Sequence, residues 1–546
     1  MTQGWNIDAA ADTITFIDAP PSGTNNIIVT EYATAEINAT SVWALGAWSA
    51  AYGYPSAVEF YDDRLGFAAT VSQPQTMWFS RTGDYSMFGK STPVLDDDAF
   101  SATMNARQLN KINALIPKQD LLVATTGGVW KVSGGDTVAL TPTTVTARPQ
   151  PSVGANELPP LDVGETAIYQ TYLGGEVRDL SYVFESDGYA GSDLTAFAGH
   201  LVRGYSLDCW AWCPQPWSAA FVARSDGTLL TLTYKREHQV VAWARHDLSG
   251  GACLQAEGIP EGDVTGTYLC VKREVNGQTV QYIERLTDVV NDDLREEVGV
   301  DCSLSYDGRN KSSTTLSLSG GAAPGEQVTV TASASIFSAS NVGDEVVIDY
   351  DGIPCRIRIL AQDSGTVVRG ISSRALKAGD LSPGTNWALA VDTLSGLDHL
   401  EGETVLVGGD GMDLGTFLVS GGSITGVPPA VISHVGLAYD SDFESLDMAI
   451  IGNESVANRR KLIREVGVLL YNTRTIKASG SGYAYLDELQ ARNVDMSMSV
   501  PPELRTEWVT IPVDGQWGKN PRVYIRHSGP YRARVLAIEP KVEFGT

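Results

Sequence analysis

Two stretches of the chain come close to known ligand-binding motifs. Gly83–Ser91 ends in Gly-Lys-Ser like a phosphate-binding loop, but the spacing before that ending is one residue too long. No strand leads cleanly into a helix there, so nucleotide binding is not expected. Gly408–Asp413 fits the first six positions of a calcium-binding nonapeptide repeat, which works by stacking many copies. Because this stretch occurs once, a tight hairpin turn is expected instead.

Neighbouring carboxylates stand at Asp62-Asp63 and Asp96-Asp97-Asp98. A propeller glycosidase needs two such groups facing a sugar, whereas adjacent strand residues point to opposite faces. Ser225-Asp226-Gly227 resembles part of the turn box of sialidase-like propellers but lacks its Ser-x-Asp spacing and closing Trp. The chain has no Gly-x-Ser-x-Gly motif and no His-Glu-x-x-His motif. We therefore expect neither catalysis nor a cofactor.

The cysteines and histidines show no metal-ligand spacing. The six of each are Cys209, Cys213, Cys253, Cys270, Cys302 and Cys355, and His200, His238, His246, His399, His434 and His527. In a chain of this length such cysteines are expected to be buried free thiols, with no metal site.

The pattern of residue types along the sequence predicts a mainly β protein. Thr, Val and Ser recur in short runs broken by Gly, Asp or Asn. Asp120–Val132 predicts a hairpin, Phe221–Arg245 a three-stranded meander, and Tyr268–Glu284 a hairpin with an Asn276-Gly277 turn. Short antiparallel strands of this kind indicate a sandwich, a barrel or a propeller.

Composition suggests three parts. Residues 1–310 are expected to form a propeller-like β domain with a linker or long loop at Thr141–Pro160, and 311–435 an inserted all-β module. Residues 436–546 are expected to be a small α+β part, whose one helix, Val456–Glu465, is capped by Asn453 or Ser455. That helix would carry a basic cluster, for which a solvated face is the more frequent explanation than a phosphate or an acidic partner. The cluster consists of Arg459, Arg460, Lys461 and Arg464.

The 546-residue chain carries a net charge of −26. This acidity argues against tight nucleic-acid binding, which depends on Lys and Arg neutralising phosphates. It fits a conduit through which DNA slides without adhering, although simple solubility is the more ordinary explanation. Met1–Asp8 has no signal-peptide character. The uncharged stretch Ile37–Val58 contains Asn38, Gly46, Gly53 and Pro55, so no membrane span is expected.

The stretch from Trp43 to Trp130 resembles the nozzle (tail tubular B-type) proteins of short-tailed bacteriophages. The residues that carry the resemblance are Trp43-Ala44-Leu45-Gly46-Ala47-Trp48, Tyr54-Pro55, Phe60, Arg64-Leu65, Phe67-Ala68, Gln73-Pro74-Gln75-Thr76, Trp78, Ser80-Arg81, Gly83-Asp84-Tyr85, Phe88 and Thr126–Lys131. Further similar parts are Val177–Leu180, Asp187–Tyr189, Asp193–Thr195, Asp226–Leu229, Gly396–Gly402, Val435–Tyr439 and Arg459–Lys461.

The chain also departs from that family. Ala68-Ala69-Thr70 stands where relatives often have a glycine. Relatives usually carry more chain ahead of Gly4-Trp5, so closure of a propeller within one chain is left open.

The resemblance implies a propeller-like domain and a platform domain in a homohexameric ring at the distal end of a phage tail. Such a ring docks on the tail adaptor, holds packaged DNA back and opens for ejection, and the partners that the resemblance implies include other tail proteins and the host surface. The protein would be a virion tail component assembled in the host cytoplasm. The interface candidates are Arg64, Trp78, Arg81, Asp84, Arg459 and Arg460. Arg81 and Asp84 could instead fix a turn within the chain by a charge-assisted hydrogen bond.

Two rival functions remain. The first is a carbohydrate-binding or polysaccharide-degrading phage tail protein, because the chain is rich in Trp and Tyr, which also suit sugar surfaces, subunit interfaces and cores. The second is a monomeric cytoplasmic β-propeller scaffold unrelated to phage.

Overall fold

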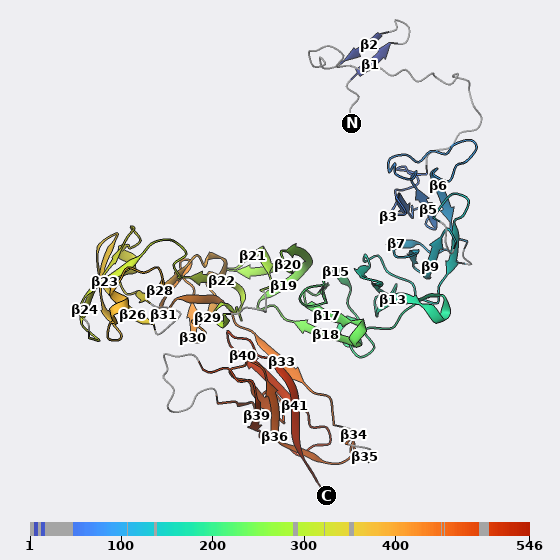
Figure 1. Cartoon of the computed structure of the whole chain (residues 1–546). Helices are drawn as coiled ribbons and strands as arrows, with labels where there is room; N and C mark the ends of the chain where they lie inside the picture. Colours follow the sequence, from blue (N-terminus) through green and yellow to red (C-terminus); the bar gives the residue numbers. More distant parts are fainter. Residues whose placement is uncertain are drawn as a thin grey trace. The chain divides into compact units, whose positions relative to one another are not determined.

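The computed structural model describes residues 5–8, 13–16, 47–105, 108–135, 139–287, 293–321, 323–348, 354–448, 450–451, 454–490 and 502–545 (Figure 1). The protein is mainly β, with 52% strand and 5% helix. It divides into two compact units, Met1–Pro55 with Thr70–Gln73 and Ser56–Ala69 with Pro74–Thr546. Residues 43–46 of the family-like stretch and the expected cap Asn453 lie outside the described residues.

The first unit contains an antiparallel hairpin of β1 (Trp5–Asp8) and β2 (Thr13–Phe16). Its register pairs Trp5 with Phe16 and Ile7 with Ile14. These two strands form a two-stranded sheet of their own.

The second unit begins with five antiparallel sheets, each built from consecutive strands. The first three are β3 (Ala57–Tyr61), β4 (Arg64–Ala68), β5 (Thr76–Phe79) and β6 (Phe100–Thr103); β7 (Ile112–Pro117), β8 (Leu121–Thr125), β9 (Gly128–Ser133) and β10 (Thr146–Pro149); and β11 (Leu161–Val163), β12 (Thr166–Gln170), β13 (Val177–Val183) and β14 (Gly188–Ala190). The last two are β15 (Leu207–Cys213), β16 (Ala219–Arg224), β17 (Leu229–Lys235) and β18 (Val240–His246); and β19 (Gly251–Glu261), β20 (Val264–Val275) and β21 (Gln278–Arg285).

Neighbouring sheets of this series share their cores. One cluster of buried side chains joins β4 and β5 to β7 and β8, and includes Met77, Phe79, Ile112 and Leu121. Equivalent clusters join the second sheet to the third, the third to the fourth and the fourth to the fifth. All five residues of β8, four of them apolar, are buried, because its side chains belong both to the core shared with the first sheet and to the core shared with the third.

The predicted hairpins and meander of this region are confirmed. β8 pairs with β9, β16–β17–β18 form the meander, and β20 pairs with β21 through the Asn276-Gly277 turn. The stretch 141–160, expected as a linker or loop, contains β10, which pairs with β9 as the edge strand of its sheet.

Two sheets follow. The seven-stranded sheet has the order β23 (Leu316–Gly320), β24 (Gln327–Ala332), β27 (Val367–Ser372), β26 (Cys355–Ser364), β25 (Glu345–Ile348), β28 (Trp387–Ser395) and β31 (Ser423–Ala430). The four-stranded sheet has the order β22 (Asp301–Asp307), β32 (Ile432–Leu437), β29 (Thr404–Gly409) and β30 (Met412–Leu418). β22 thus lies before residue 311 in sequence, yet pairs with a strand of the inserted stretch.

The C-terminal strands, orange to red in Figure 1, form three sheets. They are β33 (Asp440–Glu444), β40 (Tyr524–Ser528), β37 (Lys477–Ser479) and β38 (Asp487–Glu488); β39 (Trp508–Pro512), β36 (Lys461–Leu470) and β41 (Val535–Phe544); and β34 (Ile450–Ile451) with β35 (Glu454–Ser455). The helical elements of the described chain are short: α1 (Gly199–Val202), η1 (Phe184–Ser186), η2 (Arg236–His238), η3 (Leu294–Glu296), η4 (Ala339–Asn341), η5 (Ala378–Leu381) and η6 (Asp398–Leu400).

The predicted helix Val456–Glu465 is wrong, and with it the α+β character of the C-terminal part. A turn precedes Lys461, and β36 then runs to Leu470 between β39 and β41. Ile463, Val466 and Val468 are fully buried in the core of this sheet. Pairing on both edges of β36 outweighs the high helix propensity of the Arg and Lys residues.

Candidate functional site

Within the family-like segment, residues 80–98 form a loop that Arg64 of β4 holds in place. The Arg64 side chain is buried, with 1% of its surface exposed. Its Nη1 donates to the carbonyl oxygens of Ser80 and Asp98, and its Nη2 donates to that of Asp96, all at 2.7 Å. The guanidinium also lies over the Phe100 ring, 5.3 Å from the centroid. Arg64 is therefore committed to contacts within its own chain.

The charge of Arg64 is held in a buried environment. Burial lowers the pKa of its guanidinium, and the nearby carboxylates of Asp97 and Asp62 act in the opposite direction. An arginine remains protonated under such conditions, so three neutral carbonyl groups solvate a permanent cation.

Arg81 and Asp84 do not pair with each other through their side chains. Arg81 donates from Nε at 3.0 Å and from Nη2 at 2.5 Å to Oδ2 of Asp97. The Asp84 carboxylate accepts from the Ser86 hydroxyl at 2.8 Å, and this bond is the first cause of its lowered pKa. The turn itself is closed by the main chain, since the Asp84 N–H donates to the Arg81 carbonyl at 3.3 Å. The alternative in which Arg81 and Asp84 fix this turn by a bond between their side chains is therefore excluded.

Asp98 closes the other end of the loop. Its carboxylate accepts from the Ser91 N–H and hydroxyl, each at 2.8 Å, and from the Leu95 N–H at 2.9 Å. The bond from Leu95 is the first cause that holds the pKa of Asp98 below its ordinary value. Ser91, the last residue of the phosphate-loop-like stretch, is thus occupied, and no helix follows it.

Apolar side chains lie exposed on and beside this loop. Phe60 of β3 is 57% exposed and Tyr85 is 44% exposed, and their rings meet edge to face with centroids 5.0 Å apart. Val58 and Met87 are exposed as well. Trp78 is only partly buried on β5, opposite Phe67 and Ser101. We call Val58, Phe60, Tyr85 and Met87 the aromatic patch. Exposed apolar groups on a braced loop are typical of contact surfaces.

The basic residues just before and at the start of β36 divide into buried and exposed members. Lys461 is fully buried, and its Nζ donates to the carbonyl oxygens of Val456 at 2.7 Å and Arg459 at 3.3 Å. Arg464 pairs with Glu543 at 2.7 Å, and the Arg459 guanidinium lies 5.1 Å from the centroid of the Phe544 ring. Arg460 is exposed. Lys461 is therefore unable to present its charge to a partner, whereas Arg459, Arg460 and Arg464 are exposed.

The carboxylates that a glycosidase would use are placed in turns. Asp62 and Asp63 form the two-residue loop between β3 and β4, with φ of 47° and 54°. Both residues adopt the left-handed conformation of a type I′ hairpin turn. Asp97 and Asp98 are engaged by Arg81 and Ser91, as described above. Asp226 accepts two bonds from Arg224, which lower its pKa to about 2.

The calcium-repeat-like stretch is also a hairpin turn. Asp410 and Gly411 connect β29 to β30, with φ of 46° and 77°. The Asp410 carboxylate accepts from the Ile432 N–H at 3.0 Å and from the Arg356 Nη2 at 2.8 Å. This confirms the expected turn.

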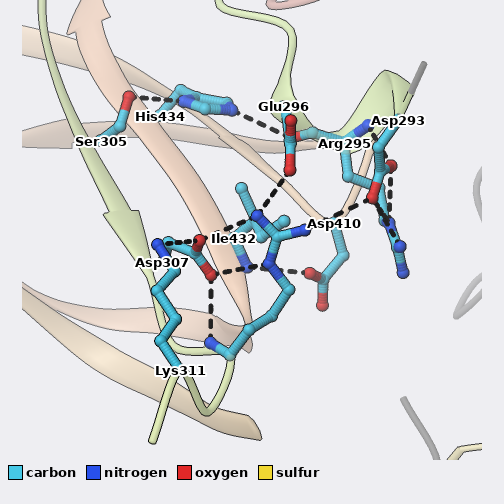
Figure 2. Close-up of polar contacts among 10 residues, drawn as sticks. Asp293, Arg295, Glu296, Ser305, Asp307, Lys311, Asp410, Ile432 and His434 are labelled. Carbon is cyan, nitrogen blue, oxygen red and sulfur yellow. Dashed lines mark hydrogen bonds and ion pairs between the residues drawn. The ribbon is translucent and has the colours of Figure 1, made fainter. Parts of the chain in front are cut away.

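A second charged cluster lies beside β22 and β32 and involves residues that the sequence did not single out (Figure 2). Arg309 donates from Nη2 to Asp307 at 2.8 Å and to Glu296 at 2.5 Å. Lys311 lies 2.8 Å from the same Asp307 carboxylate, and Arg295 forms a two-pronged pair with Asp293. The hydrogen bond from Arg309 is the first cause that holds the pKa of Asp307 well below its ordinary value.

His434 adjoins this cluster. Its Nε2 donates to the Arg295 carbonyl at 2.9 Å, which leaves Nδ1 to accept from the Ser305 hydroxyl at 2.7 Å. Burial lowers the pKa of the imidazole. No motif in the sequence points to this site, because its members come from positions 293 to 434 and share no spacing.

The part of the chain that the structure describes contains no group of three or more His, Cys, Asp or Glu residues placed to hold a metal ion. No helix among the described residues is long and apolar enough to cross a membrane.

Comparisons with known proteins give little guidance. No protein-family model matches the sequence, and no curated protein matches it. Among solved structures, a human protein, WBSCR16, is 12% identical to the chain, with a match that covers 59% of this chain and 87% of that one. The TM-score is 0.26, too low for any conclusion about fold or function.

Proposed function

We propose that the chain is a structural subunit of the nozzle ring of a short-tailed phage, which closes the tail channel and conducts DNA during ejection. The observation that carries this proposal is the family-like segment itself. Its polar residues Arg64, Arg81 and Asp84 are engaged in holding a loop, and Tyr85 and Met87 of that loop form the aromatic patch together with Val58 and Phe60 of β3. The segment thus holds a loop in a fixed conformation and exposes apolar side chains beside it, as a protein that assembles with other subunits requires.

The arrangement of the five sheets supports a propeller-like domain. The first strands of several successive sheets are neighbours: β3 contacts β7, β11 contacts β15, and β15 contacts β19. Consecutive four-stranded meanders whose first strands line a common axis are the plan of a propeller. Fold alone does not identify function, so this supports the proposal without carrying it.

Charge supports the proposal as well. A chain with a net charge of −26 repels DNA along a channel wall, so that a passing duplex does not adhere. In this proposal the protein has no catalytic role. Its partners are further copies of itself, the tail adaptor and transiently passing double-stranded DNA, and it resides in the virion tail.

The proposal is tested by the mass and shape of the purified protein. Light scattering after size-exclusion chromatography should give a species of six times the 58.4 kDa chain mass, and negative-stain images should show rings with a central channel. A monomer that also fails to form rings when mixed with the tail adaptor would contradict the proposal. Turnover of host polysaccharide by that monomer would favour the rival tail-protein function.

A further inference from the structure

We propose that the open edge of β21 pairs with a strand of the β1–β2 hairpin from a second copy of the chain. The first observation is the number of strands. Four of the five successive sheets have four strands, whereas the sheet β19–β20–β21 has three. Among the described residues β20 is the only strand that pairs with β21. Within the described chain, the outer position of this sheet is therefore not occupied by a strand.

The outer edge of β21 presents backbone N–H and C=O groups with which another strand could pair. The Leu286 N–H donates to the Thr267 carbonyl at 2.9 Å, so Leu286 faces β20. Because antiparallel strands alternate the direction of their hydrogen-bonding groups, Gln281, Ile283 and Arg285 direct their N–H and C=O groups away from β20. The side chains at these positions are exposed, that of Ile283 by 74%.

The edge also lacks the features that keep strands from associating. Edge strands are usually short, or contain proline, bulges or charges. β6 has four residues, β14 has three, and β10 contains Pro149. β21 has eight residues, pairs with β20 without a register shift, and carries its charges only at Glu284 and Arg285. Such an edge is suited to strand addition.

The chain itself supplies an occupant. β1 and β2 pair only with each other in the described structure, and a single two-stranded hairpin is at best marginally stable in water. Its register pairs apolar with apolar residues, Trp5 with Phe16 and Ile7 with Ile14. A hairpin without a sheet and a sheet without its fourth strand match one another, and exchange between copies would link the subunits of an oligomer.

A proline substitution tests the edge. Gln281→Pro removes an outward N–H that β20 does not use, so the three-stranded sheet should keep its fold. Val241→Pro is the matched control. The Tyr234 N–H donates to the Ser218 carbonyl and thus points away from β18, where Val241 is the residue opposite Tyr234. The N–H of Val241 therefore points outward, at the edge of a sheet that already has four strands. We expect Gln281→Pro to lower the association constant of the copies by about tenfold or more, and Val241→Pro to leave it unchanged. Equal effects of both, or of neither, would overturn the proposal.

Cross-linking identifies the occupant. Two differently tagged chains, one with Ile283→Cys and one with Ile14→Cys, are co-expressed and oxidised, and the linked peptides are identified by mass spectrometry so that the native cysteines do not interfere. A disulfide between the two tagged chains supports the proposal. If oxidation gives no bond between positions 283 and 14, or if a single chain with both substitutions links only within itself, the proposal is overturned.

The strand exchange rests on the proposed function in one respect: both require that copies of the chain associate. A six-chain ring that forms equally well with Gln281→Pro would refute the strand exchange and leave the ring intact. A cross-linked dimer without rings would refute the ring and leave the strand exchange intact.

Discussion

Arg64 and Arg309 stabilise two regions of this protein in contrasting ways. Arg64 is buried and donates to three neutral carbonyl groups, and burial lowers its pKa. The Arg309 side chain is 31% exposed and is surrounded by the carboxylates of Asp307, Glu296 and Asp293, and its pKa is raised, first by the bond to Asp307. The loop over β4 therefore depends on hydrogen-bond geometry, whereas the cluster beside β22 depends on charge. We expect the first to resist salt and the second to weaken with it.

The largest effect is expected from Arg64→Met. The substitution leaves three carbonyl groups without a donor, which should cost about 3 kcal/mol of unfolding free energy. Hydrogen exchange should show loss of protection for the amides of residues 80–98, at low and at high salt alike. Unchanged protection of these amides would show that the loop does not depend on Arg64, and the comparison would fail.

A smaller effect, a loss of about 1–2 kcal/mol of unfolding free energy, is expected from Asp307→Asn. The neutral amide forms weaker hydrogen bonds to its cationic partners, and the effect stays small because solvent screens the charges of this partly exposed network. The folded-state pKa of Asp307 is depressed. Its contribution is therefore present above the unfolded pKa of about 3.9 and is lost as the pH falls toward the lower folded value. Unfolding measured from pH 6 to pH 3 should show a steeper loss for the native protein than for the variant. Parallel curves would contradict the assignment.

His434 gives a further pH test. Its folded-state pKa is lowered by burial, so the unfolded chain binds more protons below pH of about 6.5. Stability is therefore fully present above that pH and decreases as the pH falls toward the folded pKa. His434→Gln should remove this part of the pH dependence, and an NMR titration of the imidazole would give the pKa directly. A folded-state pKa above 6.5 would reverse the sign and contradict the prediction.

The smallest effect on stability is expected from Arg81→Ala. The Arg81 and Asp97 side chains are 42% and 45% exposed, and exposed ion pairs of this kind contribute little to the free energy of unfolding. If Arg81 also contacts a neighbouring copy, the variant should form fewer rings at unchanged stability. Unchanged ring yield in light scattering would remove Arg81 from the interface, and Arg460→Ser provides the same test for the exposed basic turn.

The sequence by itself determined the β character and much of the local pairing. Short runs rich in β-forming residues, together with Asn276-Gly277 and the expected turn at Gly127-Gly128, were enough to place β8, β9, β20 and β21 within a few residues, although the turn between β8 and β9 is Thr126-Gly127. These elements are local hairpins, whose register depends on turn chemistry that is written in neighbouring residues. The hairpin turn at Asp410-Gly411 was predictable for the same reason.

Only the tertiary structure decided the rest. The Arg-rich stretch before Leu470 became a turn and a strand, because β39 and β41, distant in sequence, pair with both edges of β36. Arg81 pairs with Asp97 and not with Asp84, its close neighbour in sequence, because the fold of the loop brings the Asp97 carboxylate within hydrogen-bond distance. The cluster around Arg309 and His434 unites positions far apart in the chain. Such contacts follow from long-range packing, on which the spacing of residues in a single sequence carries no information.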